Sequence, residues 1–352
     1  MKTRVCRLYG QGDIRIEEAD VAAPGPGEVL VAMAAGGICG SDLHYYQDGG
    51  FGPIRVREPI ILGHEIAGTV RAVGAGVESV APGDRVAVNP SRPCNACRYC
   101  LDGLQQHCLA MRFFGSALRF PHEQGGFRDL MVVDAFQCVR VDNPEVSLAE
   151  AACAEPLAVC LHALNRAGAS AGNLAGKSVL VTGAGPIGAL TVAAARHAGA
   201  AEIVATDLQD LPLEVARRMG ATETVNVRTA PERLDAFFEG KGRFDVAFEC
   251  SAAAPALKTA VTATRPQGTV VAVGVAGDVP VPLNLIVGKE IAFVGTHRFT
   301  REYAEAVRLI DRRRIDVRPI VTSTHDLADA LAAFQAAGDR ARSIKVQLSF
   351  AS

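Results

Sequence analysis

The sequence has no excess of charge of either sign. Its 352 residues include 36 Lys and Arg against 38 Asp and Glu, which gives a formal net charge of −2. Proteins that bind nucleic acid or an anionic membrane surface through electrostatics carry a clustered basic excess. We therefore predict that neither nucleic acid nor a membrane surface is a partner.

Long hydrophobic runs are also missing. No uninterrupted apolar stretch approaches the roughly 20 residues of a membrane-spanning helix, and the opening residues MKTRVCRLYG lack the apolar core of a secretion signal. Internal repeats and low-complexity segments are absent as well. We expect a cytoplasmic protein. In that reducing compartment its 10 cysteines favour metal sites or buried thiols over disulfides.

The length, the 49% hydrophobic content and the 35 glycines suit two domains. Residues 1–152 show short, irregular strand patterns broken by Gly and Pro, which predicts a barrel-like β domain. Residues 153–297 alternate apolar strands with helical segments, the pattern of a doubly wound, parallel α/β sheet. Because six strands complete such a sheet, we expect residues 298–352 to return to the first domain.

The strongest motif is a set of four cysteines with the spacing C-x-x-C-x-x-C-x7-C: Cys94, Cys97, Cys100 and Cys108. Four thiolates on one short loop can surround a tetrahedral ion without further ligands. A closed site of this kind leaves no position for a substrate, so we predict a structural zinc. An iron–sulfur cluster is the alternative, because similar cysteine runs bind clusters.

A second candidate metal site is mixed in its donors. Cys39 offers a thiolate, His64 an imidazole and Glu65 a carboxylate, a combination that suits zinc in an open site. Ser41 and His44 follow Cys39 closely and offer a hydroxyl and a titratable ring for proton transfer. An open metal beside a proton path indicates catalysis, although a single Cys or His is more often a core residue than a ligand.

Glu155 lies early in a helical pattern over Ser147–Leu164, just before Pro156. Proline is tolerated in the first turn of a helix, so this carboxylate should lie near a helix N-terminus. The residues alone leave two interpretations open, a metal role or a simple interaction with the helix dipole.

A glycine-rich loop indicates a dinucleotide site. The apolar strand pattern Ser178–Thr182 leads into a G-x-G-x-x-G sequence and an alanine-rich helix, and a second strand ends at Asp207. The loop residues that we assign to the cofactor are Gly183, Gly185, Pro186, Ile187 and Gly188. Such glycines allow close approach of a pyrophosphate to a helix N-terminus, and the acid accepts hydrogen bonds from the adenine ribose. We predict NAD, with NADP as a possible alternative cofactor.

Together, GHE, the four-cysteine loop, EPLAV and GAGPIG resemble the zinc-containing medium-chain dehydrogenases in order and spacing, over essentially the whole chain. The polyol-dehydrogenase branch is most similar, because Glu155 stands where alcohol dehydrogenases place a third ligand cysteine. Within this branch, CGSDLHYYQ, NPSRPC, MRFFGSALRFPH and CAEPLAV look most like the idonate dehydrogenases.

The resemblance implies an α/β protein with a Rossmann sheet and a GroES-like catalytic domain, with two zinc ions per chain. Cys39 and His64 would bind the catalytic zinc. Glu65 would be a direct ligand or a close neighbour of the ion, and Glu155 would reach it directly or through water. Adjacent His and Glu side chains need a turned backbone to face one ion, which makes Glu65 the less secure ligand.

The resemblance also implies a reaction. Ser41 and His44 match the proton relay of the family, and the secondary hydroxyl of a sugar acid would be oxidised, L-idonate giving 5-ketogluconate, with hydride transfer to NAD(P). A neutral polyol such as sorbitol, or threonine, is the alternative substrate. A protein of another class, a non-catalytic NAD-binding protein that has kept the fold, is a further alternative.

Arg298 directly follows the last predicted strand of the dinucleotide sheet, Ile291–Gly295, where strand ends open into the ligand crevice. A guanidinium there could bind the carboxylate of an aldonate through two parallel hydrogen bonds. Arg112, Arg119 and His122 are weaker candidates. Relatives form dimers or tetramers, often by pairing this last strand, so we expect a homo-oligomer.

Overall fold

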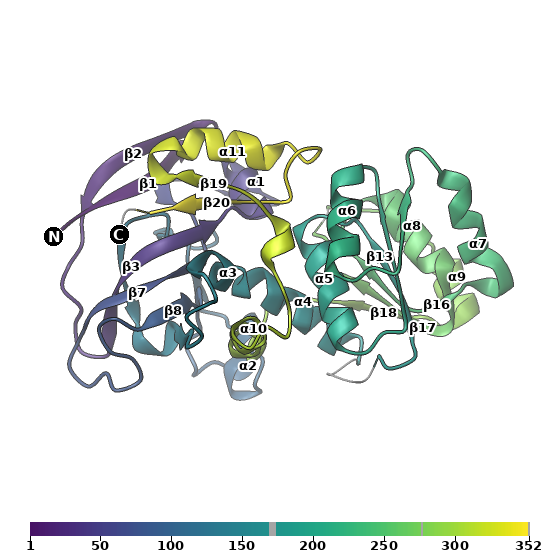
Figure 1. Cartoon of the computed structure of the whole chain (residues 1–352), viewed down its shortest axis with the longest axis horizontal. Helices are drawn as coiled ribbons and strands as arrows, with labels where there is room; N and C mark the ends of the chain where they lie inside the picture. The colour runs from purple at the N-terminus through teal and green to yellow at the C-terminus, as the bar shows by residue number, and fades with distance from the viewer. Residues whose placement is uncertain (169–173, 276, 351–352) are drawn as a thin grey trace.

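The computed structural model describes residues 1–168, 174–275 and 277–350. It has two lobes, with helices between them (Figure 1). The first lobe is built mainly of β-strands, and the second is a parallel sheet covered by helices. Within the described residues, no helix is both long and apolar enough to cross a bilayer.

The first lobe is organised around a mostly antiparallel sheet with the order β12-β8-β7-β3-β20-β19, to which β11 adds by pairing with β3. Its strands, with those of the smaller sheets beside it, are β1 (Lys2–Gly10), β2 (Asp13–Asp20), β3 (Glu28–Gly37), β4 (Gly50–Phe51), β5 (Ile54–Arg55), β6 (Ile60–Ile61), β7 (Glu65–Val73), β8 (Arg85–Val88), β9 (Ser91–Arg92), β10 (Arg112–Phe113), β11 (Leu130–Asp134), β12 (Cys138–Arg140), β19 (Val321–Asp326) and β20 (Lys345–Ser349). Its helices are α1 (Gly40–Asp48), α2 (Arg98–Leu101), α3 (Leu148–Ala152) and α11 (Ala330–Gly338).

The C-terminal strand β20 decides the geometry of the site. It pairs antiparallel with β3, with Gln347 opposite Gly37 and Ser349 opposite Ala35. The same end of β3 pairs with β7, where Gly37 is opposite Glu65. The first residues of β7 and β20 therefore flank the end of β3, although Glu65 and Lys345 are 280 residues apart in the chain.

The second lobe is a parallel sheet with the order β15-β14-β13-β16-β17-β18. Its strands are β13 (Ser178–Thr182), β14 (Glu202–Asp207), β15 (Glu223–Asn226), β16 (Phe244–Glu249), β17 (Thr264–Ala272) and β18 (Ala292–Gly295), and its helices are α5 (Pro186–His197), α6 (Asp210–Met219), α7 (Asp235–Phe238), α8 (Ala254–Ala263) and α9 (Leu283–Lys289). Val179, Leu180 and Val181 of the central strand are fully buried, as the apolar run predicted. The prediction of a doubly wound α/β sheet is confirmed.

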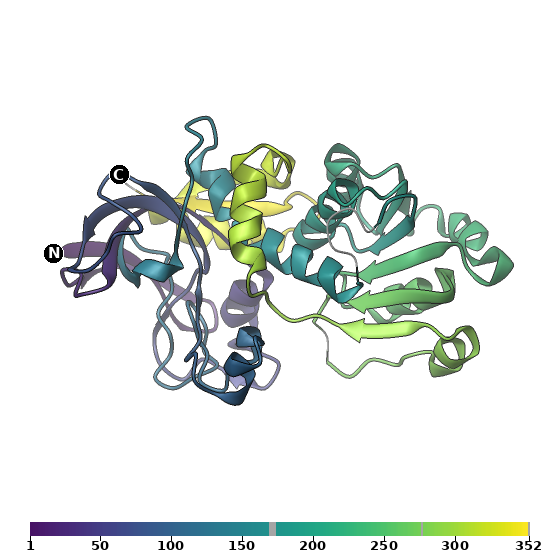
Figure 2. The ribbon, with the colours of Figure 1, turned by 90° about the horizontal axis from the view of Figure 1, so that it is seen from below.

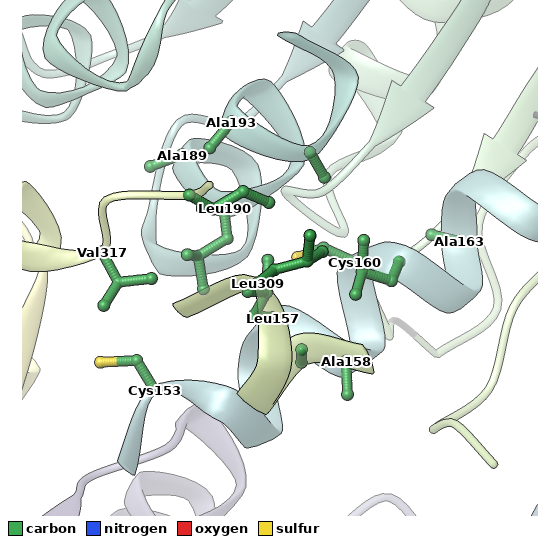
Figure 3. Close-up of a cluster of buried hydrophobic side chains, with 14 of the residues drawn as sticks. Cys153, Leu157, Ala158, Cys160, Ala163, Ala189, Leu190, Ala193, Leu309 and Val317 are labelled. Atoms are coloured by element: carbon green, nitrogen blue, oxygen red, sulfur yellow. The ribbon is translucent and has the colours of Figure 1, made fainter. Parts of the chain in front are cut away.

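The helices α4 (Ala154–Arg166) and α10 (Glu302–Asp311) lie between the lobes (Figure 1). Figure 3 shows Leu157 of α4 close to Leu190 of α5 and Leu309 of α10, with Ala158 and Ala163 further along α4. These side chains belong to one buried apolar cluster that also includes residues of β3, β7 and β13. A continuous core thus joins the lobes, and α4 is held firmly against both.

The continuous helical pattern over Ser147–Leu164 is divided in the structure into α3 and α4, with Cys153 between them. Pro156 explains the break. It has no N–H to donate to the carbonyl of Ala152, and its ring would clash with that carbonyl if α3 continued. A new helix can nevertheless start just before Pro156, because the first turn of a helix leaves its N–H groups unpaired.

Candidate active site

The four cysteines gather on one loop around α2, and their Sγ atoms all lie within 4.8 Å of one another. The sulfur atoms of Cys97 and Cys100 are 3.6 Å apart, and those of Cys94 and Cys100 are 4.0 Å apart. Thiolates around a tetrahedral zinc at 2.3 Å are separated by about 3.8 Å, whereas a disulfide bond measures about 2.0 Å. The spacing therefore fits a four-thiolate zinc site.

Backbone amides stabilise negative charge on this loop. The N–H of Cys97 donates to the Sγ of Cys94 at 3.3 Å, and the N–H of Cys94 donates to the Sγ of Cys108 at 3.2 Å. Hydrogen bonds from the backbone of Leu109 and Cys100 lower the pKa of Cys97 to about 6. Burial and the neighbouring thiols raise the pKa of Cys100 to about 12. A divalent cation would allow both groups to be thiolates together.

The second donor set consists of Cys39, His64 and Glu65, whose ligand atoms also lie within 4.8 Å of one another. Cys39 caps the N-terminus of α1, and Glu65 opens β7. Gly63 provides the turn that the adjacent His and Glu require: its φ is +95°, and a Cβ there would lie 2.2 Å from the ring of Phe127. The imidazole of His64 and the carboxylate of Glu65 both reach the thiol of Cys39.

One carboxylate oxygen of Glu65 has a hydrogen-bond partner and the other is available to a metal ion. Its Oε1 accepts a hydrogen bond of 2.7 Å from Nζ of Lys345, which also donates to the carbonyl of Ile38 at 3.0 Å. Its Oε2 is buried and has no hydrogen-bond partner among the residues that the structure describes. An unpaired buried carboxylate oxygen is costly, and a zinc ion bound beside Cys39 and His64 would compensate it.

A second buried carboxylate, that of Asp42, lies beside the ring of His64. The Asp42 side chain is fully buried, accepts a hydrogen bond from the N–H of Cys39 at 3.0 Å, and has its Oδ1 3.7 Å from Nδ1 of His64. Burial lowers the pKa of His64, but the negative charges of Asp42 and Cys39 outweigh it and raise this pKa well above the usual value. Metal-binding histidines commonly have a carboxylate neighbour; at 3.7 Å, Asp42 acts on His64 through its charge rather than through a hydrogen bond.

The sequence interpretation did not include Asp42 or Lys345. Asp42 is the third residue of α1, and its side chain takes part in a capping box with Cys39. That spacing is a signal that could have been noticed. Lys345 stands at the start of the final strand and is only 3% exposed. A charged residue at the start of the predicted final strand was the one indication available.

Glu155 lies in the first turn of α4 and is buried. It does not belong to the group formed by Cys39, His64 and Glu65. Its pKa is raised to about 7, mainly by burial and also by Glu65, against the opposing effect of His64. The carboxyl group is thus near the three donors, but it is farther from them than they are from one another.

Ser41 and His44 lie one turn apart on α1. Ser41 is half-buried next to Cys39, whereas the His44 side chain is 43% exposed. Nδ1 of His44 is 2.9 Å from Oδ2 of Asp48, and its ring lies 5.1 Å from that of Phe51. One short helix therefore connects the half-buried Cys39 with solvent.

The glycine loop between β13 and α5 has the geometry that a dinucleotide requires. Gly183 has a φ of +84°, and a Cβ on Gly188 would lie 1.8 Å from the carbonyl oxygen of Gly183, so neither position accepts a side chain. Gly185 caps α5, and a Cβ there would meet no atom within 4 Å. The helix starts at Pro186 and continues through Ile187. Its free N–H groups can face a pyrophosphate.

Asp207 ends β14 beside this loop. Its Oδ2 accepts a hydrogen bond of 2.8 Å from the N–H of Ala184, and its Oδ1 accepts one of 3.0 Å from the N–H of Gln209. Two backbone amides thus hold the carboxylate at the edge of the glycine loop.

Arg298 follows β18 and has a φ of +52°. Its guanidinium carbon lies 4.3 Å from the centroid of the Phe113 ring, a cation–π contact with the first lobe. Burial lowers the pKa of Arg298, and Glu155 and Tyr45 raise it. The guanidinium of Arg298 and the carboxyl group of Glu155 therefore interact electrostatically.

The three weaker candidates already have partners. Arg112 Nε is 2.5 Å from Oε1 of Glu123, and Arg119 donates to the carbonyl of Ala110 at 2.9 Å. Nε2 of His122 accepts a hydrogen bond of 2.9 Å from the N–H of Arg57. Of the three arginines considered, Arg298 is the one whose positive charge lowers the pKa of Glu155.

The mixed donor set, the four-cysteine loop and the dinucleotide loop together define a dehydrogenase of the zinc-binding type. The family model of the alcohol dehydrogenase GroES-like domain matches residues 25–143, and that of the zinc-binding dehydrogenases matches residues 186–312. The chain belongs to the zinc-binding dehydrogenase family. This confirms the predicted GroES-like domain, the predicted class of enzyme and zinc as a cofactor.

Within this family, the chain is similar to dehydrogenases named for polyols and sugar acids. L-idonate 5-dehydrogenase (NAD(P)(+)) of Escherichia coli K12 is 39% identical over 355 residues, covering 99% of both chains. Sorbitol dehydrogenase of Gallus gallus is 36% identical, covering 97% of this chain and 94% of its own. The crystal structure of the E. coli L-idonate 5-dehydrogenase superposes with a TM-score of 0.93 at 38% identity, covering 99% of each chain.

Proposed function

We propose that this protein oxidises the C5 hydroxyl of L-idonate to give 5-ketogluconate, with NAD as the hydride acceptor. The observation that carries this proposal is the position of the half-buried Arg298 guanidinium, which lies 4.3 Å from the centroid of the Phe113 ring. That ring is in turn 5.4 Å from the ring of His64 in the mixed metal-donor set. The charge of Glu155 also raises the pKa of Arg298 against the effect of burial. The 39% identity to an enzyme named for L-idonate supports the same substrate. Hydride leaves C5, the hydroxyl proton goes to solvent, and the products are a ketone, NADH and a proton.

Cys39, His64 and Glu65 would hold the catalytic zinc, with Asp42 and Lys345 fixing two of these ligands. A zinc ion held by these residues would supply Lewis-acid chemistry that lowers the pKa of the reacting hydroxyl, and bound NAD would supply the hydride acceptor. Because Glu155 lies outside the group of three donors, it would contact the ion through a water molecule rather than directly.

Ser41 and His44 would carry the proton away. Ser41 is half-buried and lies two residues after Cys39, and His44 reaches solvent one turn later on the same face of α1. If Asp48 accepts the Nδ1 proton of His44, Nε2 is left free to exchange a proton with the Ser41 hydroxyl.

Arg298 would bind the substrate carboxylate, since a partly desolvated guanidinium favours a planar anion. Sorbitol is the second candidate substrate, because sorbitol dehydrogenases are also more than 30% identical to this chain. In that case Arg298 would contact polyol hydroxyls instead.

Asp207 favours NAD. The carboxylate is held by the amides of Ala184 and Gln209, so it cannot easily turn away from a 2′-phosphate. Like charges at that range repel strongly. NADP remains the second cofactor to test, since the E. coli relative is named for both dinucleotides.

We also propose a homo-oligomer assembled along β18. This strand is an edge of the six-stranded sheet, and exposed edges are templates for pairing. Phe293 on the strand is 38% exposed, and Val275, Leu283 and Val287 in neighbouring segments are each at least 65% exposed. Light scattering on the purified protein would measure the number of chains per particle.

The decisive experiment compares initial rates on L-idonate, sorbitol and threonine with NAD and with NADP, before and after a chelator. Arg298→Ala should raise the KM for idonate far more than that for sorbitol, by about 1.5–3 kcal/mol for one charged hydrogen bond. Arg119→Ala is the matched control, because Arg119 is bonded to a carbonyl and should leave both KM values unchanged. Equal losses on both substrates would place the carboxylate elsewhere, and a wild-type preference for sorbitol would make it the substrate.

A further inference from the structure

We propose that Glu302 is a positioning residue for substrate binding: together with His162 and Asn165 of α4, it fixes the loop of residues 296–301 so that Arg298 faces the metal-donor set. This inference rests on the proposed role of Arg298 in binding substrate. Figure 2 shows this part of the chain leaving β18 and crossing to α10, which Glu302 begins.

The Glu302 carboxylate is almost fully buried, at 4% exposure, and both of its oxygen atoms are used. Oε1 accepts hydrogen bonds from Nδ1 of His162 at 3.0 Å and from Nδ2 of Asn165 at 2.9 Å. Oε2 accepts from the backbone N–H of Thr300 at 2.8 Å and from its hydroxyl at 3.2 Å. Since an ionised carboxylate only accepts, Nδ1 of His162 must carry a proton.

Through Glu302, these hydrogen bonds connect the loop of residues 296–301 to the helix α4. His162 and Asn165 belong to α4, whereas Thr300 belongs to the Arg298 loop. Burial alone would raise the pKa of Glu302, but the hydrogen bonds from His162, Thr300 and Asn165 hold it well below the usual value. The carboxylate therefore stays charged at neutral pH, and each bond to it is charge-assisted.

The helix that holds the loop is also the helix that carries Glu155. Glu155 and His162 are seven residues apart, or about two turns, so they lie on one face of α4. Arg166, one turn further along, donates from Nε to the carbonyl of Gly295 at 3.0 Å. The loop is thus attached to α4 at both of its ends, which fixes the position of Arg298 relative to Glu155.

Arg298 needs such support because of its backbone. A positive φ in a residue with a side chain is unfavourable and persists only where the surroundings enforce it. The next residue, Phe299, is anchored: it is 2% exposed, and its ring packs at a tilt against that of Tyr303, with the ring centroids 5.5 Å apart. If the Glu302 contacts were weakened, we expect the backbone at Arg298 to relax and its guanidinium to leave the ring of Phe113.

The test is a double-mutant cycle on whichever alcohol the wild type oxidises fastest. Glu302→Gln keeps the shape of the side chain but cannot accept all four hydrogen bonds. We expect it to raise KM about tenfold, the size of one lost charged hydrogen bond, with kcat and zinc content changed much less. In an Arg298→Ala background, the same Glu302→Gln change should have no further effect on KM.

Glu150→Gln is the matched control. Glu150 is another buried carboxylate, which accepts hydrogen bonds of 2.8 Å from both the N–H and the hydroxyl of Ser147 and pairs with Arg313 in the turn that follows α10. This variant should lower the melting temperature without changing KM. If Glu302→Gln multiplies KM by the same factor with and without Arg298, the role of Glu302 is purely structural and the proposal is overturned.

Asn165→Ala covers the case in which Glu302→Gln does not fold. This change removes one of the four hydrogen-bond donors to Glu302. It should raise KM by a smaller factor than Glu302→Gln does, and this increase should again vanish in the Arg298→Ala background. An unchanged KM would overturn the proposal.

The outcome of this cycle is separate from the substrate assignment. An enzyme that oxidises sorbitol but not idonate contradicts the proposed function while leaving the cycle measurable, whereas idonate oxidation with an additive cycle contradicts the positioning role alone.

Discussion

The two metal-donor sets differ in how the chain builds them. All four cysteines of the first set lie between residues 94 and 108 on one loop. The second set combines the N-terminus of α1 with the start of β7, and its Glu65 is fixed by Lys345 from β20. A local set needs only a suitable loop, whereas a dispersed set requires the whole sheet around β3 to be assembled first.

The sets also balance their charge differently. In the cysteine loop, backbone N–H groups donate to the sulfur atoms of Cys94 and Cys108, and Cys94 is exposed to solvent. In the mixed set, the charges are balanced by other buried side chains, above all by Lys345 and Asp42. We therefore expect the cysteine loop to control metal content and stability, and the mixed set to control catalysis. Four substitutions test this contrast, in order of their expected effect on turnover.

Cys39→Ala should have the largest effect. Loss of the catalytic zinc removes several kcal/mol of charge stabilisation, which corresponds to a decrease in kcat of about 10³-fold or more. Zinc content should fall to about half if each site holds one ion, while the melting temperature changes little. Metal analysis and initial rates measure this, and substantial activity in the zinc-depleted variant would remove Cys39 from the site.

His44→Ala should lower turnover by roughly 10- to 1,000-fold, the usual contribution of a positioned acid–base group. The loss should be greatest at neutral and lower pH, where solvent bases are scarce. Because His44 lies outside the mixed donor set, zinc content should stay at the wild-type level. A variant that loses zinc would show that His44 binds the metal instead of relaying protons.

Lys345→Met should affect stability more than turnover. It leaves the buried Glu65 without its cation, and breaking a buried ion pair costs about 3–5 kcal/mol. The loss should be larger in the presence of a chelator than with zinc bound, since the ion itself neutralises Glu65. Lys2→Met is the control: its ion pair with Asp20 is exposed, so urea unfolding should show about 0–1 kcal/mol. Equal losses in the two variants would mean that Lys345 does not support the site.

Cys97→Ser should have the smallest effect on turnover per folded chain. It should remove about half of the zinc and lower the melting temperature, because structural zinc contributes directly to folding. Purified wild-type protein with a single zinc, bound only at the Cys39 set, would show that the cysteine loop holds no ion. A loss of turnover as large as that of Cys39→Ala would remove the distinction between the two sets.

The sequence by itself determined the features that depend on local spacing. The interval between Cys94 and Cys108 restricts four thiols to one loop, and the glycines at 183, 185 and 188 leave room for a pyrophosphate at the start of α5. The alternation of apolar strands and helices predicted the parallel sheet, because strands buried on both faces must be apolar throughout. In each case the physical cause operates within about 30 residues of chain.

Only the tertiary structure decided which distant side chains meet. Pairing of β20 with β3 brings Lys345 to Glu65, and packing of α10 on α4 brings Glu302 to His162, 140 residues away in the chain. Tertiary packing also leaves Glu155 outside the group of three donors. No spacing rule predicts these contacts, because burial forces a charged side chain to find a partner but does not specify which partner the packing will supply.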